Sequence, residues 1–166
     1  MASDIRYVSQ PDFVGTEFHI SGKYDMEVRL GIPGLFNVVN ALAAVSVCSF
    51  LGLDQARISH ALENIRVNGR MEIVYTSERC TVLVDYAHNA VSMESLLSTL
   101  RDYKPKRLVC VFGCGGNRSP LRRFQMGETA GRLSDVTILT SDNPRYEKPE
   151  AILSDIEQGM KRTKGK

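Results

Sequence analysis

The 166-residue sequence predicts an α/β protein built on a Rossmann-like, mostly parallel sheet that is incomplete in this chain. Three short apolar runs predict its strands, at residues 81–84, 108–112 and 136–140. Each run stops at a polar or glycine-rich cluster and is followed by a helical pattern, which is typical of repeated β-α units. Such units place their strands parallel, with the carboxyl ends along one edge where open sheets bind ligands. Doubly wound sheets usually have more strands, so we expect a fragment.

A β-hairpin and two helices are expected before this sheet. Apolar residues alternate on both sides of a Ser-Gly-Lys turn at 21–23, which predicts two antiparallel strands. These residues are Phe18, Ile20, Met26, Val28 and Leu30. An alanine-rich helix is expected at residues 37–51, ending at Gly52. Asp54 is the expected cap of the next helix, because apolar residues then recur at helical spacing. Those residues are Ile58, Ala61, Leu62 and Ile65.

The Asn68-Gly69 turn signal marks the expected boundary between two domains, residues 1–68 and residues 69–166. Beyond it the pattern changes from paired helices to alternating strands and helices. A strand at about 72–76 is expected to open the second domain.

The helices of the second domain have clear start signals. Asn89 is the expected N-cap of the first, which carries apolar residues along one face. Further helices are expected at about 124–133 and 150–160, and Pro149 suits the first turn of the last one.

Composition limits the possible partners. A formal charge of +2, from 21 basic and 19 acidic residues, provides no electrostatic reason to expect nucleic acid or an anionic membrane as partner. No apolar run approaches the roughly 18 residues that a membrane span needs. The four cysteines show neither CxxC nor His-containing metal spacing, so we expect reduced thiols, no metal site and a cytoplasmic location.

The motif Asp142-Asn143-Pro144-Arg145 follows the last predicted strand and is the most discriminating one. Pro144 fixes one backbone dihedral and biases Asn143 towards extended geometry, which holds Arg145 in a defined direction. A guanidinium held in this way can grip a carboxylate with two parallel hydrogen bonds. The alternative is an Asn-Pro turn followed by an ordinary surface arginine.

A glycine-rich run at 113–116, followed by Asn117 and Arg118, comes after the middle strand. It lacks the GxGxxG order of a dinucleotide-binding loop, so a structural turn between strand and helix is the alternative. The first strand ends at Asp85-Tyr86-Ala87-His88, which offers a carboxylate, a phenol and an imidazole. Here the alternative is that Asp85 and His88 cap the following helix.

Asn37 and Asn40 lie three residues apart at a predicted helix start and therefore share a face. Paired amides can donate to and accept from the edge of a purine base. A simple N-cap at Asn37 is the alternative. The sequence contains no GxxxxGK[ST] phosphate loop, so this chain alone is not expected to hydrolyse ATP.

Five motifs, read in order and at their spacing, resemble the Mur ligases and most of all their diaminopimelate-adding branch. They are Gly34 to Asn40, Gly69-Arg70-Met71-Glu72, Asp85 to His88, Phe112 to Arg118, and Asp142 to Arg145. The resemblance implies an ATP-dependent amide ligase of peptidoglycan synthesis. Residues 1–68 would then be the hairpin-plus-helices end of a central ATP-binding domain. Residues 69–166 would begin the C-terminal ligase domain.

The resemblance also implies roles for individual residues. Contacts to ATP are expected from Asn37, Asn40, Arg70, Asp85 and His88. Contacts to meso-diaminopimelate are expected from Arg118, Asp142, Asn143, Pro144 and Arg145. The whole enzyme would use ATP, Mg²⁺ and a UDP-N-acetylmuramoyl-dipeptide, while this fragment would carry no catalytic residue of its own. Without the resemblance, Arg70 would be an ordinary surface residue.

Two other functions remain open. A lysine-adding Mur ligase is one, although lysine has no remote carboxylate and would leave Arg145 without its partner. A nucleotide-binding module without ligase activity is the other.

Overall fold

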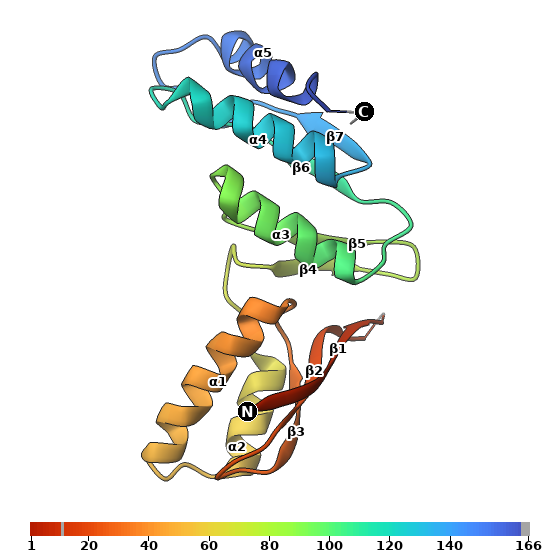
Figure 1. Ribbon diagram of the computed structural model, residues 1–166, viewed down its shortest axis with the longest axis vertical. Helices are drawn as coiled ribbons and strands as arrows, with labels where there is room; N and C mark the ends of the chain where they lie inside the picture. The colour runs from red at the N-terminus through yellow and green to blue at the C-terminus, as the bar shows by residue number, and fades with distance from the viewer. Residues whose placement is uncertain (11, 164–166) are drawn as a thin grey trace. The chain divides into compact units, whose positions relative to one another are not determined.

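The computed structural model describes residues 1–10 and 12–163 (Figure 1). Contacts divide the chain into two compact units, residues 1–86 and 87–166, which are described separately below. Such a unit need not coincide with a domain of the protein family. The expected domain boundary after residue 68 therefore stays a prediction.

The first unit opens with a three-stranded antiparallel sheet in the order β1 (Ala2–Ser9), β2 (Val14–Ile20) and β3 (Met26–Leu30). The predicted hairpin is β2–β3, in which Ile20 pairs with Met26. All five of its alternating apolar residues are buried, which confirms their predicted role. β1 was not predicted from the sequence, because its apolar residues do not alternate regularly and its register with β2 shifts between Ser3 and Arg6.

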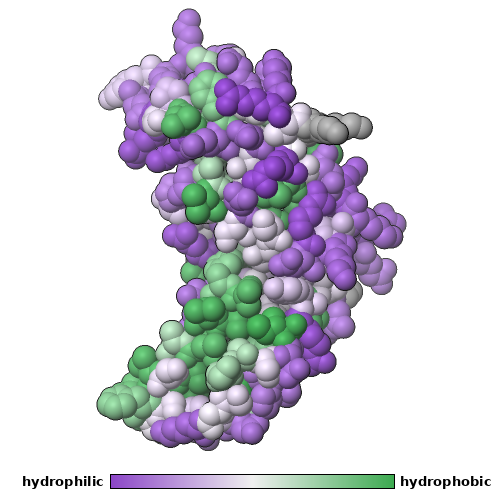
Figure 2. Space-filling view, viewed as in Figure 1, coloured by the Kyte–Doolittle hydropathy of each residue, from purple (hydrophilic) through white to green (hydrophobic). Residues whose placement is uncertain are grey.

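Two helices, α1 (Leu35–Phe50) and α2 (Gln55–Asn64), pack against this sheet (Figure 1). Gly52 is left-handed with φ of 73°, and the Asp54 carboxylate accepts a hydrogen bond from Arg57 N at 3.1 Å, as predicted. The expected apolar face of α2 is confirmed only in part, since Ile58 and Leu62 are buried whereas Ala61 and Ile65 are exposed. On its other side α1 exposes apolar residues, which Figure 2 shows gathered over this helix.

The first unit ends in a hairpin of β4 (Glu72–Thr76) and β5 (Thr81–Val84). Both strands were predicted, whereas the expected place of β5 in one parallel sheet with the two later strands stays a prediction, because those strands belong to the second unit. β5 is hydrogen-bonded to β4 in antiparallel register within the first unit. The physical reason is proximity, because a short turn closed by Ser77 N and Cys80 O, 2.9 Å apart, brings β4 beside β5 at little entropic cost.

The second unit alternates helices and strands. Its elements are α3 (Ala90–Asp102), β6 (Val109–Phe112), α4 (Pro120–Leu133), β7 (Val136–Leu139) and α5 (Pro149–Met160). Asn89 and Ser92 form a capping box at the start of α3, so the predicted cap is confirmed. β6 and β7 form a parallel pair, as expected. The protein is thus an α/β protein with small, mixed sheets.

Helices α4 and α5 approach each other closely because two glycines face the opposite backbone. A Cβ atom on Gly127 would lie 2.1 Å from Ile156 O, and one on Gly159 would lie 2.1 Å from Phe124 O. The core beneath them includes Met126, Ala130 and Ile156. No helix in the described part of the chain is long and apolar enough to cross a membrane.

Candidate functional site

The carboxyl ends of β6 and β7 lie side by side. The parallel register pairs Phe112 with Leu139, and Thr140 N donates to Phe112 O at 3.0 Å just beyond the last pair. The two strands therefore end in step. The loops that follow them, residues 113–119 and 140–148, start next to each other, as parallel pairing predicts for this pair.

Glycine allows these two loops to touch through their backbones. A Cβ atom on Gly113 would lie 2.2 Å from Thr140 O, and one on Gly116 would lie 1.9 Å from Pro144 O, so no other residue fits at either position. Gly116 N donates to Asn143 O at 2.8 Å. The glycine-rich run is therefore needed for backbone contact with the second loop. It is more than a simple turn between strand and helix.

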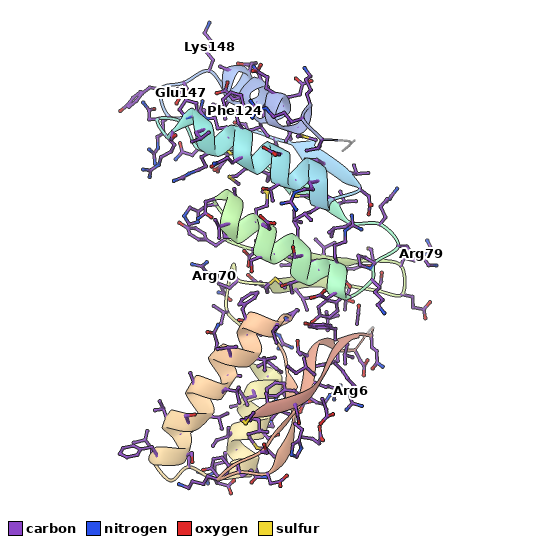
Figure 3. The ribbon with its side chains drawn as sticks, viewed as in Figure 1. Arg6, Arg70, Arg79, Phe124, Glu147 and Lys148 are labelled. Carbon is purple, nitrogen blue, oxygen red and sulfur yellow. The ribbon has the colours of Figure 1, made fainter. Side chains whose placement is uncertain are left out.

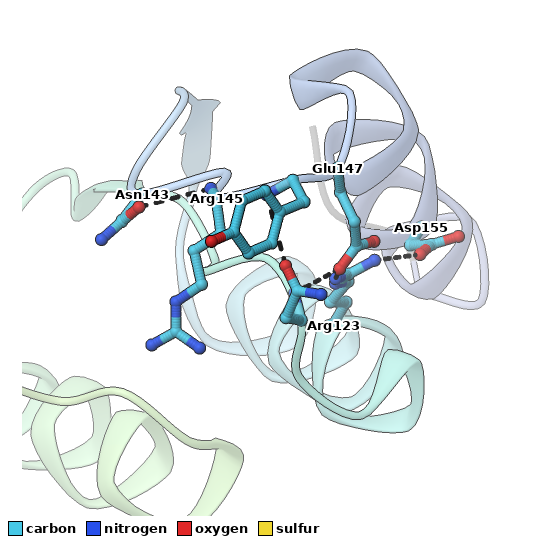
Figure 4. Close-up of polar contacts among 7 residues, drawn as sticks. Arg123, Asn143, Arg145, Glu147 and Asp155 are labelled. Carbon is cyan, nitrogen blue, oxygen red and sulfur yellow. Dashed lines mark hydrogen bonds and ion pairs between the residues drawn. The ribbon is translucent and has the colours of Figure 1, made fainter.

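Asn117 and Arg145, one from each loop, adopt left-handed backbone geometry, both with φ of 51°. This region is uncommon for residues other than glycine, although asparagine enters it more easily than arginine. Tyr146 N donates to Asn117 Oδ1 at 3.3 Å, and Arg145 N donates to Asn143 Oδ1 at 3.3 Å (Figure 4). The arginine backbone is thus held in strained geometry by its neighbours.

A buried arginine lies behind the loops. The Arg123 side chain is 3% exposed and pairs with Glu147 at 2.7 Å and with Asp155 at 2.9 Å (Figure 4). The hydrogen bond from Arg123, followed by one from Asn117 N, lowers the pKa of the Glu147 carboxyl below its ordinary value. Glu147 is therefore ionised and joins α4 to both loops.

Sequence reasoning missed Arg123, although a signal was present. α4 begins at Pro120, four residues before the predicted start, so Arg123 lies on the helix in register with buried Met126 and Ala130. A charged residue at helical spacing from an apolar stripe is a candidate for a buried ion pair.

The predicted substrate residues lie on these two loops. Asp142, Asn143, Arg118 and Arg145 are exposed, whereas Pro144 is half-buried. Within residues 1–10 and 12–163, neither Arg118 nor Arg145 forms an ion pair. The Arg145 guanidinium extends away from the Arg123 cluster (Figure 4). The structure therefore presents free cationic side chains on a braced backbone.

The other predicted arginine, Arg70, belongs to the first unit (Figure 3). It sits in a tight turn in which Gly69 and Met71 are left-handed and Gly69 N donates to Glu72 Oε2 at 2.6 Å. Met71 N donates to Asp85 Oδ2 at 2.8 Å, which ties this turn to the end of β5. The Arg70 guanidinium carbon lies 4.7 Å above the Tyr86 ring.

The remaining predicted nucleotide contacts are two amides and a histidine. Asn40 Nδ2 donates to Asn37 Oδ1 at 3.3 Å, so the two amides share a face as predicted. The alternative that Asn37 is an N-cap is wrong, because α1 begins at Leu35 and Gly34 holds the cap position. His88 is exposed, and the alternative cap by Asp85 or His88 is wrong because Asn89 caps α3.

The described residues offer little covalent or metal chemistry. Burial raises the pKa of the Cys110 and Cys114 thiols to about 11, so both are protonated at neutral pH and are poor nucleophiles. Among the residues with assigned positions, no group of three or more His, Cys, Asp or Glu side chains could hold a metal ion. The site is suited to binding and orientation.

Comparison with known families decides what this arrangement belongs to. The profile described as "Mur ligase, glutamate ligase domain" matches residues 69–165. The chain belongs to the Mur ligase family. Both strand-end loops and the Gly69 to Glu72 turn lie inside the matched residues.

Curated relatives in this family carry a more specific name. The UDP-N-acetylmuramoyl-L-alanyl-D-glutamate–2,6-diaminopimelate ligase of Alkaliphilus oremlandii is 44% identical over 149 residues, covering 89% of this chain and 30% of the relative. The second such ligase of Clostridium acetobutylicum is 42% identical, covering 96% and 32%. A solved structure of a ligase with this name superposes with a TM-score of 0.65 at 34% identity, covering 95% of this chain and 32% of that one. This Mur ligase chain thus spans about a third of its relatives' length.

Proposed function

We propose that the longer protein carrying this chain is an ATP-dependent ligase that joins meso-diaminopimelate to UDP-N-acetylmuramoyl-L-alanyl-D-glutamate in peptidoglycan synthesis. The observation that carries the proposal is Arg145, which is exposed, forms no ion pair with another described residue and lies on a braced loop of a Mur ligase chain. Relatives 42% to 44% identical to the chain are named as diaminopimelate ligases, which supports this substrate.

In this proposal, the loops after β6 and β7 bind the amino-acid substrate. Arg145 grips the remote carboxylate of meso-diaminopimelate with two parallel hydrogen bonds, each worth about 1.5–3 kcal/mol. Arg118 binds a second anionic group, and the Asp142 carboxylate and Asn143 amide suit an ammonium group. Pro144 sets the direction of the arginine. Catalysis is then mostly positioning, since these side chains hold the attacking amine near the reacting carboxyl group.

ATP is proposed to contact five polar residues of this chain. The Asn37 and Asn40 amides suit the edge of adenine, whereas Arg70 suits phosphate oxygens and is reachable because its guanidinium lies on an exposed ring. Asp85 and His88 complete the set. Mg²⁺ is implied by the family alone, and the residues described here hold no cluster of metal ligands, so its ligands would come from other parts of the protein.

Three structural proposals accompany this function. Residues 1–68 end an ATP-binding domain and residues 69–166 begin a ligase domain, which the family match from residue 69 supports. The β6–β7 pair belongs to a larger, Rossmann-like sheet, which its parallel direction supports. A cytoplasmic location is supported by the free thiols of all four cysteines.

The test is amide-bond formation by the longer protein with Arg145→Ala. We expect the KM for meso-diaminopimelate to rise about 100-fold, the equivalent of about 2.7 kcal/mol, with a small change in the KM for ATP. Arg79→Ala is the matched control, because Arg79 is an exposed arginine in the β4–β5 turn (Figure 3).

Three results would contradict the proposal. An unchanged KM in Arg145→Ala would make Arg145 an ordinary surface residue. Equal use of lysine by the unaltered protein would favour the lysine-adding ligase. Absence of amide formation with any amino acid would favour a nucleotide-binding module.

A further inference from the structure

One carboxylate lies at the centre of the contacts between the two loops. Glu147 Oε1 accepts from Asn117 N in the loop after β6 and from Arg123 Nη2 in α4, the latter at 2.7 Å. Glu147 N donates to Pro144 O at 3.0 Å within the loop after β7. Glu147 is therefore bonded at once to α4 and to both loops that carry the exposed arginines.

The guanidinium that holds this carboxylate is itself fixed. Arg123 Nη1 donates to Asp155 Oδ2 in α5 at 2.9 Å, so two carboxylates bind the two terminal nitrogens of a guanidinium whose side chain is 3% exposed. Arg123 Nε is buried and has no hydrogen-bond partner among the described residues. A buried arginine with an unsatisfied nitrogen costs stability, which is an unfavourable choice for packing alone.

The two ion pairs of Arg123 differ in what their carboxylates contact. The Glu147 pair reaches Asn117, whose side chain in turn accepts from Tyr146 N beside left-handed Arg145. Asp155 lies on α5, and within residues 1–10 and 12–163 its hydrogen bond is to Arg123 and not to either loop. Only the first pair therefore bears on the geometry of the loops.

We propose that Arg123 and Glu147 are positioning residues for the amino-acid substrate, holding Asn117 and Arg145 in the backbone geometry that directs Arg118 and Arg145 at their ligand. The inference deepens the proposed function and rests on it. Neither residue touches the substrate. Loss of the Arg123–Glu147 ion pair would leave the Arg118 and Arg145 side chains less well oriented, which weakens substrate binding more than turnover.

The experiment compares Glu147→Gln with Asp155→Asn in the longer protein. Both changes are isosteric, and each removes one charge pair from the same guanidinium. We expect Glu147→Gln to raise the KM for meso-diaminopimelate about tenfold while kcat and the KM for ATP change less than about twofold. Asp155→Asn should change all three by less than about twofold. If Glu147→Gln does not fold, Arg123→Lys carries the same expectation, because lysine keeps the charge but loses the two-pronged donor.

A second measurement separates failure of this inference from failure of the proposed function. Amide hydrogen exchange at residues 113–118 and 141–147 should accelerate in Glu147→Gln and not in Asp155→Asn, whatever the substrate. If exchange is faster in Glu147→Gln but the unaltered protein does not use diaminopimelate, the proposed function is wrong and the support of the loops by Glu147 still holds. Normal use of diaminopimelate with an unchanged KM in Glu147→Gln, or equal rises in both variants, would overturn the inference alone.

Discussion

The loops after β6 and β7 and the turn before β4 both present an arginine beside left-handed backbone, yet they are held in different ways. The first pair of loops meets through glycine backbone and a buried ion pair between Arg123 and Glu147. The turn before β4 is held by carboxylates, with Asp85 accepting from Met71 N at 2.8 Å and Glu72 accepting from Gly69 N at 2.6 Å.

This difference follows from how far apart the joined segments are in the sequence. The strand-end loops come from separate β-α units about 30 residues apart, and they approach so closely that a methyl group would collide with a carbonyl oxygen. The turn before β4 brings its own residues close together, so hydrogen bonds from backbone N–H groups to two carboxylates are enough to hold it. The first arrangement should therefore be sensitive to added volume, and the second to lost hydrogen bonds.

The largest expected effect comes from adding one methyl group to the loop contact. Gly116→Ala would place Cβ 1.9 Å from Pro144 O, whereas Gly115→Ala would place it at an ordinary 3.6 Å from Asn143 O. We expect Gly116→Ala to cost about 1–3 kcal/mol of stability and about 100-fold in kcat/KM for diaminopimelate, because the loops must separate.

The neighbouring variant provides the control for this prediction. Gly115→Ala should stay within about threefold of the unaltered protein in kcat/KM and within about 0.5 kcal/mol in stability. Denaturant unfolding and steady-state kinetics measure both quantities. Equal effects at the two glycines would show that the backbone contact does not matter.

The next effect, of similar size but on stability alone, is expected where a carboxylate holds the turn. Asp85→Ala leaves the buried Met71 N–H without its acceptor and should lower the free energy of unfolding by about 1–3 kcal/mol. Asp85→Asn keeps an acceptor oxygen and should lose less than half as much. Urea unfolding of the two variants measures the difference, and equal losses would show that charge, rather than the hydrogen bond, stabilises the turn.

The smallest effect is a shift in acid stability at the loop contact. The hydrogen bond from Arg123 lowers the folded-state pKa of Glu147, so its stabilising contribution is complete above the ordinary pKa and is lost as pH falls through the lowered value. The Tm of the unaltered protein should therefore fall more steeply below about pH 4.5 than that of Glu147→Gln. Thermal unfolding across the acid range tests this, and parallel curves would contradict it.

Much of the local structure was predictable because its causes lie within one turn of chain. The caps at Asp54 and Asn89 and the alternation of Phe18 and Ile20 were expected, and all are observed. The parallel direction of β6 and β7 was also expected, because a helix connects the two strands. β1 was missed because its apolar residues do not alternate regularly.

The closeness of the two strand-end loops was predictable, but the ion pair that supports them was not. Arg118 and Arg145 were expected on neighbouring loops, and the loops do meet. The pairing of β5 with β4 was not foreseen, because apolar patterns identify a strand without naming its partner or direction.

Short-range chemistry was therefore sufficient to identify the helices, most of the strands and the polar residues at the strand ends. Folding in three dimensions alone buried Arg123 between two carboxylates and brought the two strand-end loops into backbone contact. The reason is that propensities and caps act between residues a few positions apart. Burial and loop contact depend on groups that lie 24 and more residues away along the chain.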